Sequence, residues 1–462
     1  MLDNDDTTRR QKRVDTHRAD GDEPLSNNSA NPTFADVIAQ RTSRREVLVG
    51  GLAAAVTAVF APTLVRAAGL AAGESPLAGL LGFKPVPISE ADTVVVPDGY
   101  RVDVLVPWGT PLDGSGGFSQ SSSGAAQARE VGSHHDGMHF FPLKGSSTDG
   151  LLVINHEYVE PRFLHASYTG EALSSDEVIV EDGTRDPDLV LKEMNAHGVS
   201  VLRVHRDAEG RWNLKADPVN RRITALTPID ISGPARGAPQ LRTKYSPEGT
   251  QVRGTLNNCA HGVTPWDTYM TAEENWAGYF RNGDPELPRE HDRYGVATGP
   301  SRYAWELAAS EADEMVRFDA SSTAADATGD YRNEPNAFGW LVEIDPFDPK
   351  SVPVKRTHLG RFAHESVVFA PPKPGQPVVC YSGDDARFEY IYKFVSAEPY
   401  DPDTASGALL DAGTLYVARF NADGSGDWLA LAPGENGLTP ENGFADLADI
   451  LVNTRLAADL VG

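Results

Sequence analysis

The sequence predicts an all-β fold, on three observations. Short segments rich in β-branched and aromatic residues recur along the chain, turn signals separate them, and helical stripes are few. The predicted strands are residues 151–157, 199–204, 340–345, 378–383, 390–395 and 414–420. Because no repeat of fixed length and signature is visible, the pattern leaves a sandwich, a barrel and a propeller open.

The periodicity of the predicted strands and the character of the segments between them support an all-β fold. Several strands alternate apolar and polar residues with a period of two, which is typical of a half-buried strand. The best helical stripe, 304–318, lies in a polar insertion over about 281–335, which we expect to be a loop with a short helix. The C-terminal residues 445–462 also read as a helix where a closing strand would be expected. We therefore expect the β-fold to be incomplete at its C-terminal end.

The charge balance excludes some partners. Acidic residues outnumber basic ones 66 to 41, so the formal net charge is −25. Such a surface repels nucleic acid and anionic membranes, and no basic patch for nucleic acid is visible outside the N-terminus. The same acids supply oxygen ligands for hard cations such as calcium.

The N-terminal segment resembles an export signal. Arg44 and Arg45 precede an apolar run, 47–60, that is shorter than the roughly 20 residues of a membrane span, and a small-residue stretch follows. We therefore predict a twin-arginine signal over 1–68 and a folded domain over 69–462. The alternative is an uncleaved N-terminal anchor. We expect a mature protein without a membrane span, exported by the twin-arginine machinery to the periplasm or beyond.

The two cysteines, Cys259 and Cys380, leave two alternatives open. In an oxidising compartment they would form one disulfide. Otherwise one is a buried residue and the other a metal ligand, and the sequence does not decide between these.

Residues that commonly bind metals gather at the ends of predicted strands. The clusters are His134, His135, Asp136 and His139; Asn155, His156 and Glu157; Glu273, Glu274 and Asn275; Arg361, His364 and Glu365; and Asp384, Asp385, Arg387 and Glu389. Any one of them is ordinary, since such acids often lie in turns and such histidines often hydrogen-bond in the core. Together they predict a cation cluster, because strand ends gather side chains at one mouth and crowded carboxylates repel one another. Carboxylates suit calcium, while a thiolate and imidazoles add a transition metal.

At this point a family resemblance emerges. The twin-arginine leader is followed by HHDGMHFFPL, GLLVINHEYVEP, RRITALTPIDISGPARG, GTLNNCAHGVTPWDTYMTAEENW, FGWLVEIDPFDP, LGRFAHES, YSGDDARFEYIYKFV and GTLYVARFNADGSGDW. In this order they resemble the PhoX-type alkaline phosphatases from about residue 95 to the C-terminus. No G-x-S-x-G elbow, Walker loop, dinucleotide fingerprint or HExxH helix is present.

The resemblance implies a six-bladed β-propeller whose axial site holds two ferric ions, three calcium ions and a bridging oxo group. The implied activity is hydrolysis of phosphate monoesters, and some diesters, outside the cytoplasm during phosphate acquisition. By motif matching, Cys259 is expected to bind iron. The other expected metal ligands are Glu157, Glu273 or Glu274, Glu365, Glu389, Asp384, Asp385 and His156. Arg387 is expected to face the substrate phosphate, and Arg361 and Glu389 join it in the catalytic set.

Two departures from the family and three alternatives stay open. Ala272 stands where we expect many members to carry a second cysteine, and members run past the equivalent of Gly462, so we expect the last blade to be truncated. We expect a monomer. The competing functions are a non-catalytic calcium-binding propeller, a phytase-like enzyme and a lactonase. Iron bound through a thiolate would favour the phosphatase, whereas calcium without iron would favour the calcium-binding propeller or a phytase-like site.

Overall fold

The computed structural model describes residues 27, 29, 31, 84, 86–115, 119, 121–165 and 183–462. The arginine pair and the apolar run of the predicted export signal lie outside these residues, as does the predicted boundary after residue 68. The chain divides into two compact units. The first comprises Met1–Asn31, Val106–Arg419 and Asp427–Gly462, and the second comprises Pro32–Leu105 and Phe420–Gly426. In the second unit, residues 86–105 are mostly exposed and form neither helix nor strand.

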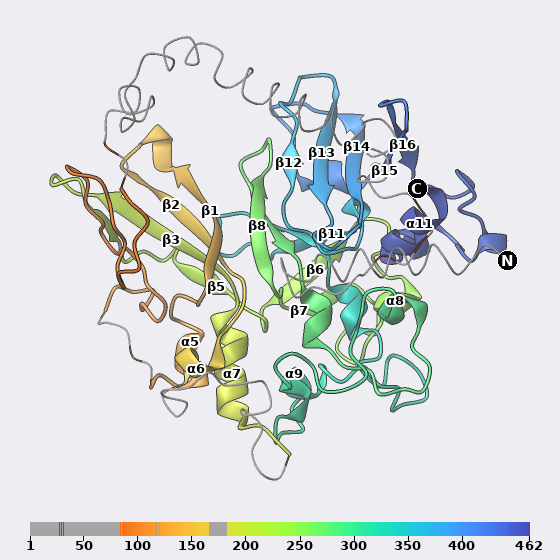
Figure 1. Cartoon of the computed structure of the whole chain (residues 1–462), viewed down its shortest axis with the longest axis horizontal. Coiled ribbons are helices and arrows are strands. Elements are labelled where there is room, and N and C mark those ends of the chain that lie inside the picture. Colours follow the sequence, from red (N-terminus) through yellow and green to blue (C-terminus); the bar gives the residue numbers. More distant parts are fainter. Residues whose placement is uncertain are drawn as a thin grey trace. The chain divides into compact units, whose positions relative to one another are not determined.

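The first sheet of the first unit has five antiparallel strands (Figure 1). They are β1 (His135–Pro142), β2 (Asp149–His156), β3 (Gly198–Arg206), β4 (Trp212–Leu214) and β5 (Arg221–Ile223). The order is β1-β2-β3-β4, and β5 also pairs with β3. Val153 and Val201 are fully buried where β2 and β3 pair, as expected of central strands.

The second sheet has six strands in the order β7-β6-β11-β10-β9-β8. They are β6 (Pro228–Ser232), β7 (Gln251–Arg253), β8 (Asn258–Val263), β9 (Tyr269–Glu273), β10 (Leu341–Ile344) and β11 (Val354–Arg356). Only the β6–β11 pair among these is parallel. Every residue of β9 and β10 is buried, so this sheet is covered on both faces.

The third sheet is an antiparallel meander of five strands taken in chain order. They are β12 (Val368–Phe369), β13 (Pro377–Gly383), β14 (Ile391–Pro399), β15 (Gly413–Phe420) and β16 (Gly426–Ala430). Strand β8 packs against β1, β2 and β12, so it connects the three sheets (Figure 1).

The helices in the described residues are short. They are α5 (Gly124–Gln127), α6 (Pro161–Leu164), α7 (Pro187–Ala196), α8 (Arg289–Asp292), α9 (Asp313–Val316), α10 (Leu447–Val452) and α11 (Thr454–Val461). Single 3-10 turns are η2 (Leu143–Gly145), η5 (Pro239–Leu241), η6 (Trp276–Tyr279), η7 (Trp305–Leu307), η8 (Glu334–Ala337), η9 (Thr357–Leu359), η10 (Gly407–Leu410) and η11 (Pro440–Asn442). None of the described helices is long and apolar enough to cross a membrane.

The expected loop with a short helix is confirmed for the polar insertion, but the helical stripe over 304–318 does not form one continuous helix. This segment contains only η7 and α9, because the backbone between them bonds to another part of the chain. Arg185 N–H donates to Leu307 O, and Ala309 N–H donates to Arg185 O, both at 2.9 Å. This bridge uses groups that a continuous helix would need for its own bonds. The C-terminal helix is confirmed as α10 and α11.

The prediction of an all-β fold with few short helices is confirmed in its general form, and each of the six predicted strand segments contains a strand. Within the described residues the strands form three open sheets, and a closed ring of six blades is not confirmed. One apolar core runs through the first unit and includes Trp276, Trp305 and Trp340, each almost fully buried. Each fully buried Val, Leu, Ile, Phe or Met side chain of this core stabilises the fold by about 1.5–3 kcal/mol through removal from water.

Candidate metal centre

A bulge at the start of β8 positions the thiol of Cys259. The residue before the strand, Asn257, has a φ of 50°, and the pairing with β9 shifts register between Asn258 and His261. Such a bulge re-aims the side chains near it. Asn155 fixes the bulge, because its Nδ2 donates to the carbonyls of Cys259 and, at 3.0 Å, of Ala260. The Cys259 side chain is therefore held half-buried rather than packed in the core.

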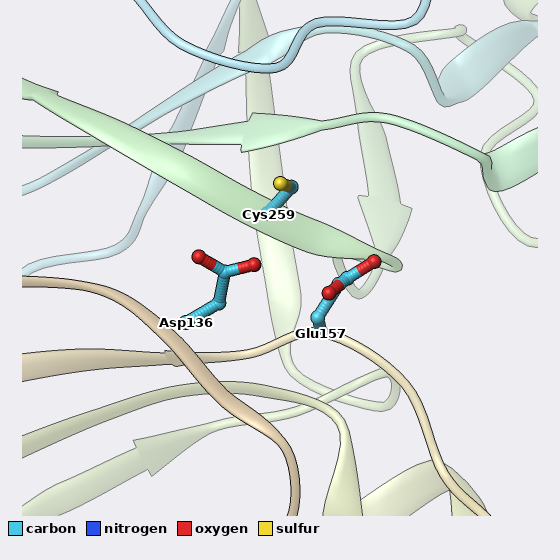
Figure 2. Close-up of side chains that lie close together, drawn as sticks. All are labelled: Asp136, Glu157 and Cys259. Carbon is cyan, nitrogen blue, oxygen red and sulfur yellow. The ribbon is translucent and has the colours of Figure 1, made fainter. Parts of the chain in front are cut away.

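The β1–β2 hairpin supplies two carboxylates at the same place. Glu157 directly follows β2, and its N–H donates to His134 O at 3.1 Å. Asp136 lies in β1 where the register with β2 is irregular. One ligand atom each from Asp136, Glu157 and Cys259 lies within 4.8 Å of the other two. Figure 2 shows the three side chains converging from β1, the end of β2 and β8.

Three more carboxylates belong to the same location. The Glu274 carboxyl hydrogen-bonds to the Cys259 thiol and to the Asp385 carboxyl, and Asn275 Nδ2 donates to Glu274 Oε1 at 2.7 Å. Glu365 lies near them, since burial and then the charges of Asp385 and Asp136 raise its pKa. We call the six residues Asp136, Glu157, Cys259, Glu274, Glu365 and Asp385 the acidic centre.

The electrostatics of the acidic centre favour cations. Burial raises the pKa of Glu157 to about 7, and a hydrogen bond and the charge of Asp136 add to this. Burial and the hydrogen bond to Asp385 raise the pKa of Glu274 to about 8. Burial, followed by the charge of Glu274, also raises the pKa of the Cys259 thiol. Crowded carboxyls that share protons in this way exchange them for cations.

The donor set fits the metals that the motifs imply. Five carboxyl groups supply hard oxygen ligands, which calcium prefers and ferric iron accepts. The single thiol supplies a soft ligand suited to iron and not to calcium. Both cysteines are free thiols, so Cys259 is not in a disulfide. Cys380 is buried in β13, and burial raises its pKa, as expected of a core cysteine.

Glu273, which was predicted as a ligand together with its neighbour Glu274, lies outside the acidic centre. Its side chain is fully buried and forms an ion pair with Lys355, whose Nζ lies 2.8 Å from Oε1. Its Oε2 also accepts from the backbone N–H groups of Gly339 and Trp340, at 3.0 and 3.1 Å. All of these partners belong to the second sheet or its approach, so Glu273 ties the sheet together.

Two other predicted acids are held by arginines. Arg455 donates to both oxygens of Asp384, at 2.6 and 2.8 Å. Arg293 donates to both oxygens of Glu389, at 2.8 and 2.9 Å. Both carboxylates are fully buried. Bidentate pairs of this kind are strong and hold the β13–β14 loop to α8 and α11.

The remaining predicted residues have other surroundings. Arg361 is fully buried and donates to main-chain carbonyls, and its guanidinium carbon lies 4.3 Å from the ring centre of Trp276. His156 is buried, with Nε2 2.7 Å from the Ser200 hydroxyl. Arg387 is half-buried in the β13–β14 loop, two residues after Asp385. The structure therefore joins Glu157, Cys259, Glu274, Glu365 and Asp385 from the predicted set.

Sequence reasoning left two nearby residues out of its site. Asp136 was visible as part of the HHDG motif but was not selected among the ligands. Arg302 gave no signal, because it lies in the long polar insertion. Burial raises the pKa of Glu157, and the charge of Arg302 opposes part of that rise.

Comparison with known families agrees with this geometry. Residues 81–462 match the family described as alkaline phosphatase PhoX. The chain belongs to this family. The resemblance that the motifs indicated is thus confirmed.

A solved structure described as "Pseudomonas fluorescens PhoX in complex with vanadate, a transition state analogue" is similar to this PhoX-family chain, with a TM-score of 0.72 and 38% sequence identity. The match covers 83% of this chain and 64% of the solved one. The chain therefore spans less than two thirds of that relative's length. Comparison with curated proteins finds no match.

Proposed function

We propose that this chain is a metal-dependent alkaline phosphatase that hydrolyses phosphate monoesters to inorganic phosphate and an alcohol. Membership of the PhoX family supports the reaction class. The observation that carries the proposal is the convergence of Asp136, Glu157 and Cys259 within 4.8 Å, beside further carboxylates (Figure 2). A site of this kind suits phosphoryl transfer, in which catalysis is mostly positioning and neutralisation of charge.

The cofactor we propose is the family's set of two ferric and three calcium ions. The carboxylates of the acidic centre would hold both metals, and the Cys259 thiolate would bind iron. When bound, such ions offset the negative charge that develops on the phosphoryl oxygens.

The chain's own residues prepare this site. Glu157 and Glu274 lose their protons as the site loads, because their raised pKa values come from burial and neighbouring carboxyls. Asn275 orients Glu274 through its bond to Oε1, and Asn155 fixes the main chain beside Cys259. Such supporting hydrogen bonds orient the ligands, and loss of one typically reduces metal affinity about 10–100-fold.

Vanadate provides a direct test of the reaction class. The Pseudomonas fluorescens protein is described as a complex with vanadate, a transition-state analogue. We propose that the acidic centre of this chain takes the same oxyanion. Purified, metal-loaded protein should hydrolyse p-nitrophenyl phosphate, and vanadate should inhibit it competitively. The absence of hydrolysis in protein that contains iron and calcium would refute the proposal.

We also propose the family's finer features for this chain. The three sheets would be parts of a six-bladed propeller, and the protein would act as a monomer in the periplasm or outside the cell. The predicted export signal supports the location, and it can be tested by fusing residues 1–68 to a folded reporter. Export should be lost when Arg44 and Arg45 are both changed to Lys.

A further inference from the structure

Arg302 contacts two chain segments that each supply a carboxylate of the acidic centre, one following Glu157 and one following Glu274. The main-chain N–H of Arg302 donates to the carbonyl of Gly278, at 2.8 Å. Gly278 lies in η6, the turn that follows Glu274. The Arg302 guanidinium carbon lies 5.5 Å from the ring centre of Tyr158, the residue after Glu157. The same carbon lies 5.3 Å from the ring centre of Tyr303.

The surroundings of Arg302 hold it in place. The Tyr303 hydroxyl donates to Val159 O at 3.0 Å, and the Tyr303 ring packs against Tyr279 and Trp305 in the buried aromatic core. The guanidinium therefore rests over tyrosine rings on a rigid base. Cation–π contact orients an arginine without using its hydrogen-bond donors.

Those donors are not used within the described part of the chain. There the Arg302 side chain is exposed and forms no hydrogen bond or ion pair with another described residue, whereas Arg293, Arg361 and Arg455 are each bonded to carboxylates or carbonyls. The electrostatic coupling of Arg302 to Glu157 also indicates that its charge reaches the acidic centre. A cation beside a carboxylate cluster, with its donors exposed, suits an anion that arrives from solvent.

We propose that Arg302 binds the phosphoryl oxygens of the substrate. This inference rests on the proposed phosphatase function. Two guanidinium N–H groups match two oxygens of a phosphate, and such bidentate bonds position the group as well as hold it. Arg302 thus supplies a direct phosphate contact from the polar insertion, separate from Arg387 in the β13–β14 loop.

The test compares Arg302→Gln and Arg302→Lys with Arg211→Gln. Arg211 is exposed in the β3–β4 turn, at the opposite end of the β2–β3 ladder from Glu157. Each metal-loaded protein is titrated with inorganic phosphate by calorimetry, and its iron and calcium contents are measured. Kinetics with p-nitrophenyl phosphate give KM and kcat separately.

We expect Arg302→Gln to weaken phosphate binding about tenfold or more, because charge-assisted bonds are lost. The substitution should raise KM and leave both metal contents unchanged. Arg302→Lys should recover part of the affinity, and Arg211→Gln should match the wild type. Wild-type phosphate affinity in Arg302→Gln would overturn the proposal, and so would a loss of metal that explains the weaker binding. If wild-type, metal-loaded protein neither hydrolyses the ester nor binds phosphate, the proposed function itself fails, and this inference fails with it.

Discussion

Glu273 and Glu274 are neighbours in the chain, but their carboxylates have different partners. Glu273 ends β9 and accepts from the Lys355 ammonium at 2.8 Å inside the second sheet. Glu274 hydrogen-bonds to the Cys259 thiol and the Asp385 carboxyl in the acidic centre. Because consecutive residues of an extended chain point to opposite sides, the pair serves structure on one side and the candidate site on the other.

Because the two carboxylates have different partners, matched substitutions of Glu273 and Glu274 should have different effects. Glu273→Gln should lower the free energy of unfolding by about 3–5 kcal/mol, because it leaves Lys355 buried without its counter-charge. Glu274→Gln should change the stability of the metal-free protein by no more than about 1 kcal/mol. After loading with metal, however, this variant should contain less metal than the wild type. Urea unfolding and elemental analysis measure the two effects.

Removing the lysine as well provides a control for the first effect. Lys355→Met combined with Glu273→Gln should be more stable than Glu273→Gln alone, since no unpaired charge is then buried. If Glu273→Gln instead unfolds like the wild type and loses metal, Glu273 is a ligand and the assignment is reversed.

The acidic centre should make metal-free protein sensitive to alkaline pH. The pKa values of Glu157 and Glu274 are raised from the ordinary value of 4.5 to about 7 and about 8. Raised carboxyl pKa values mean that the folded state holds protons more tightly than the unfolded state. Stability should therefore fall as pH rises from about 4.5 through about 8.

Bound metal should remove this loss, because cations replace the protons. We expect the gain in thermal midpoint between chelated and metal-loaded protein to increase from pH 5 to pH 8. An equal gain at both values would contradict the proposed exchange. The metal-free variant Glu274→Gln should show a smaller decrease across the same range.

The pKa of Glu193 is shifted in the opposite direction, so this carboxylate predicts a loss of stability in acid. Burial would raise the pKa of Glu193, but the charge and hydrogen bonds of Arg185, with a bond from His165, lower it to about 2. Since the unfolded value is near 4.5, this stabilisation is complete above 4.5 and is lost as pH falls toward 2. Glu193→Gln should lose stability at pH 6 and show a weaker dependence on pH between 4.5 and 2. Urea midpoints of the two proteins test this, and parallel curves would refute it.

The sequence predicted the strands better than the helices. The strands at 151–157 and 199–204 could be predicted because both of their faces are buried and therefore carry runs of β-branched and other apolar residues. The helical stripe over 304–318 forms only a 3-10 turn and the short helix α9, because Arg185, far away in sequence, takes two of its backbone groups. Helix α7 was missed, although Asp186 caps it and Pro187 begins it.

The candidate site was predicted only in part, because contacts between residues far apart in the sequence decide which side chains enter it. Motif matching found the right segments, but adjacent acids such as Asp384 and Asp385 could not be separated. Which of the two enters the acidic centre depends on Arg455, which lies 71 residues after Asp384 and binds it. Arg302 was missed because its position depends on packing against Tyr158 and Tyr303, which no local pattern indicates.

The most direct test of the central claim is the iron and calcium content of the purified protein beside that of Cys259→Ser and Cys380→Ser. We predict iron and calcium together in the wild type, with phosphatase activity that is lost on chelation. Cys259→Ser should lose iron and activity and stay folded, and Cys380→Ser should keep both, because Cys380 is a core residue. Wild-type iron in Cys259→Ser, or calcium without iron in the wild type, would contradict the account.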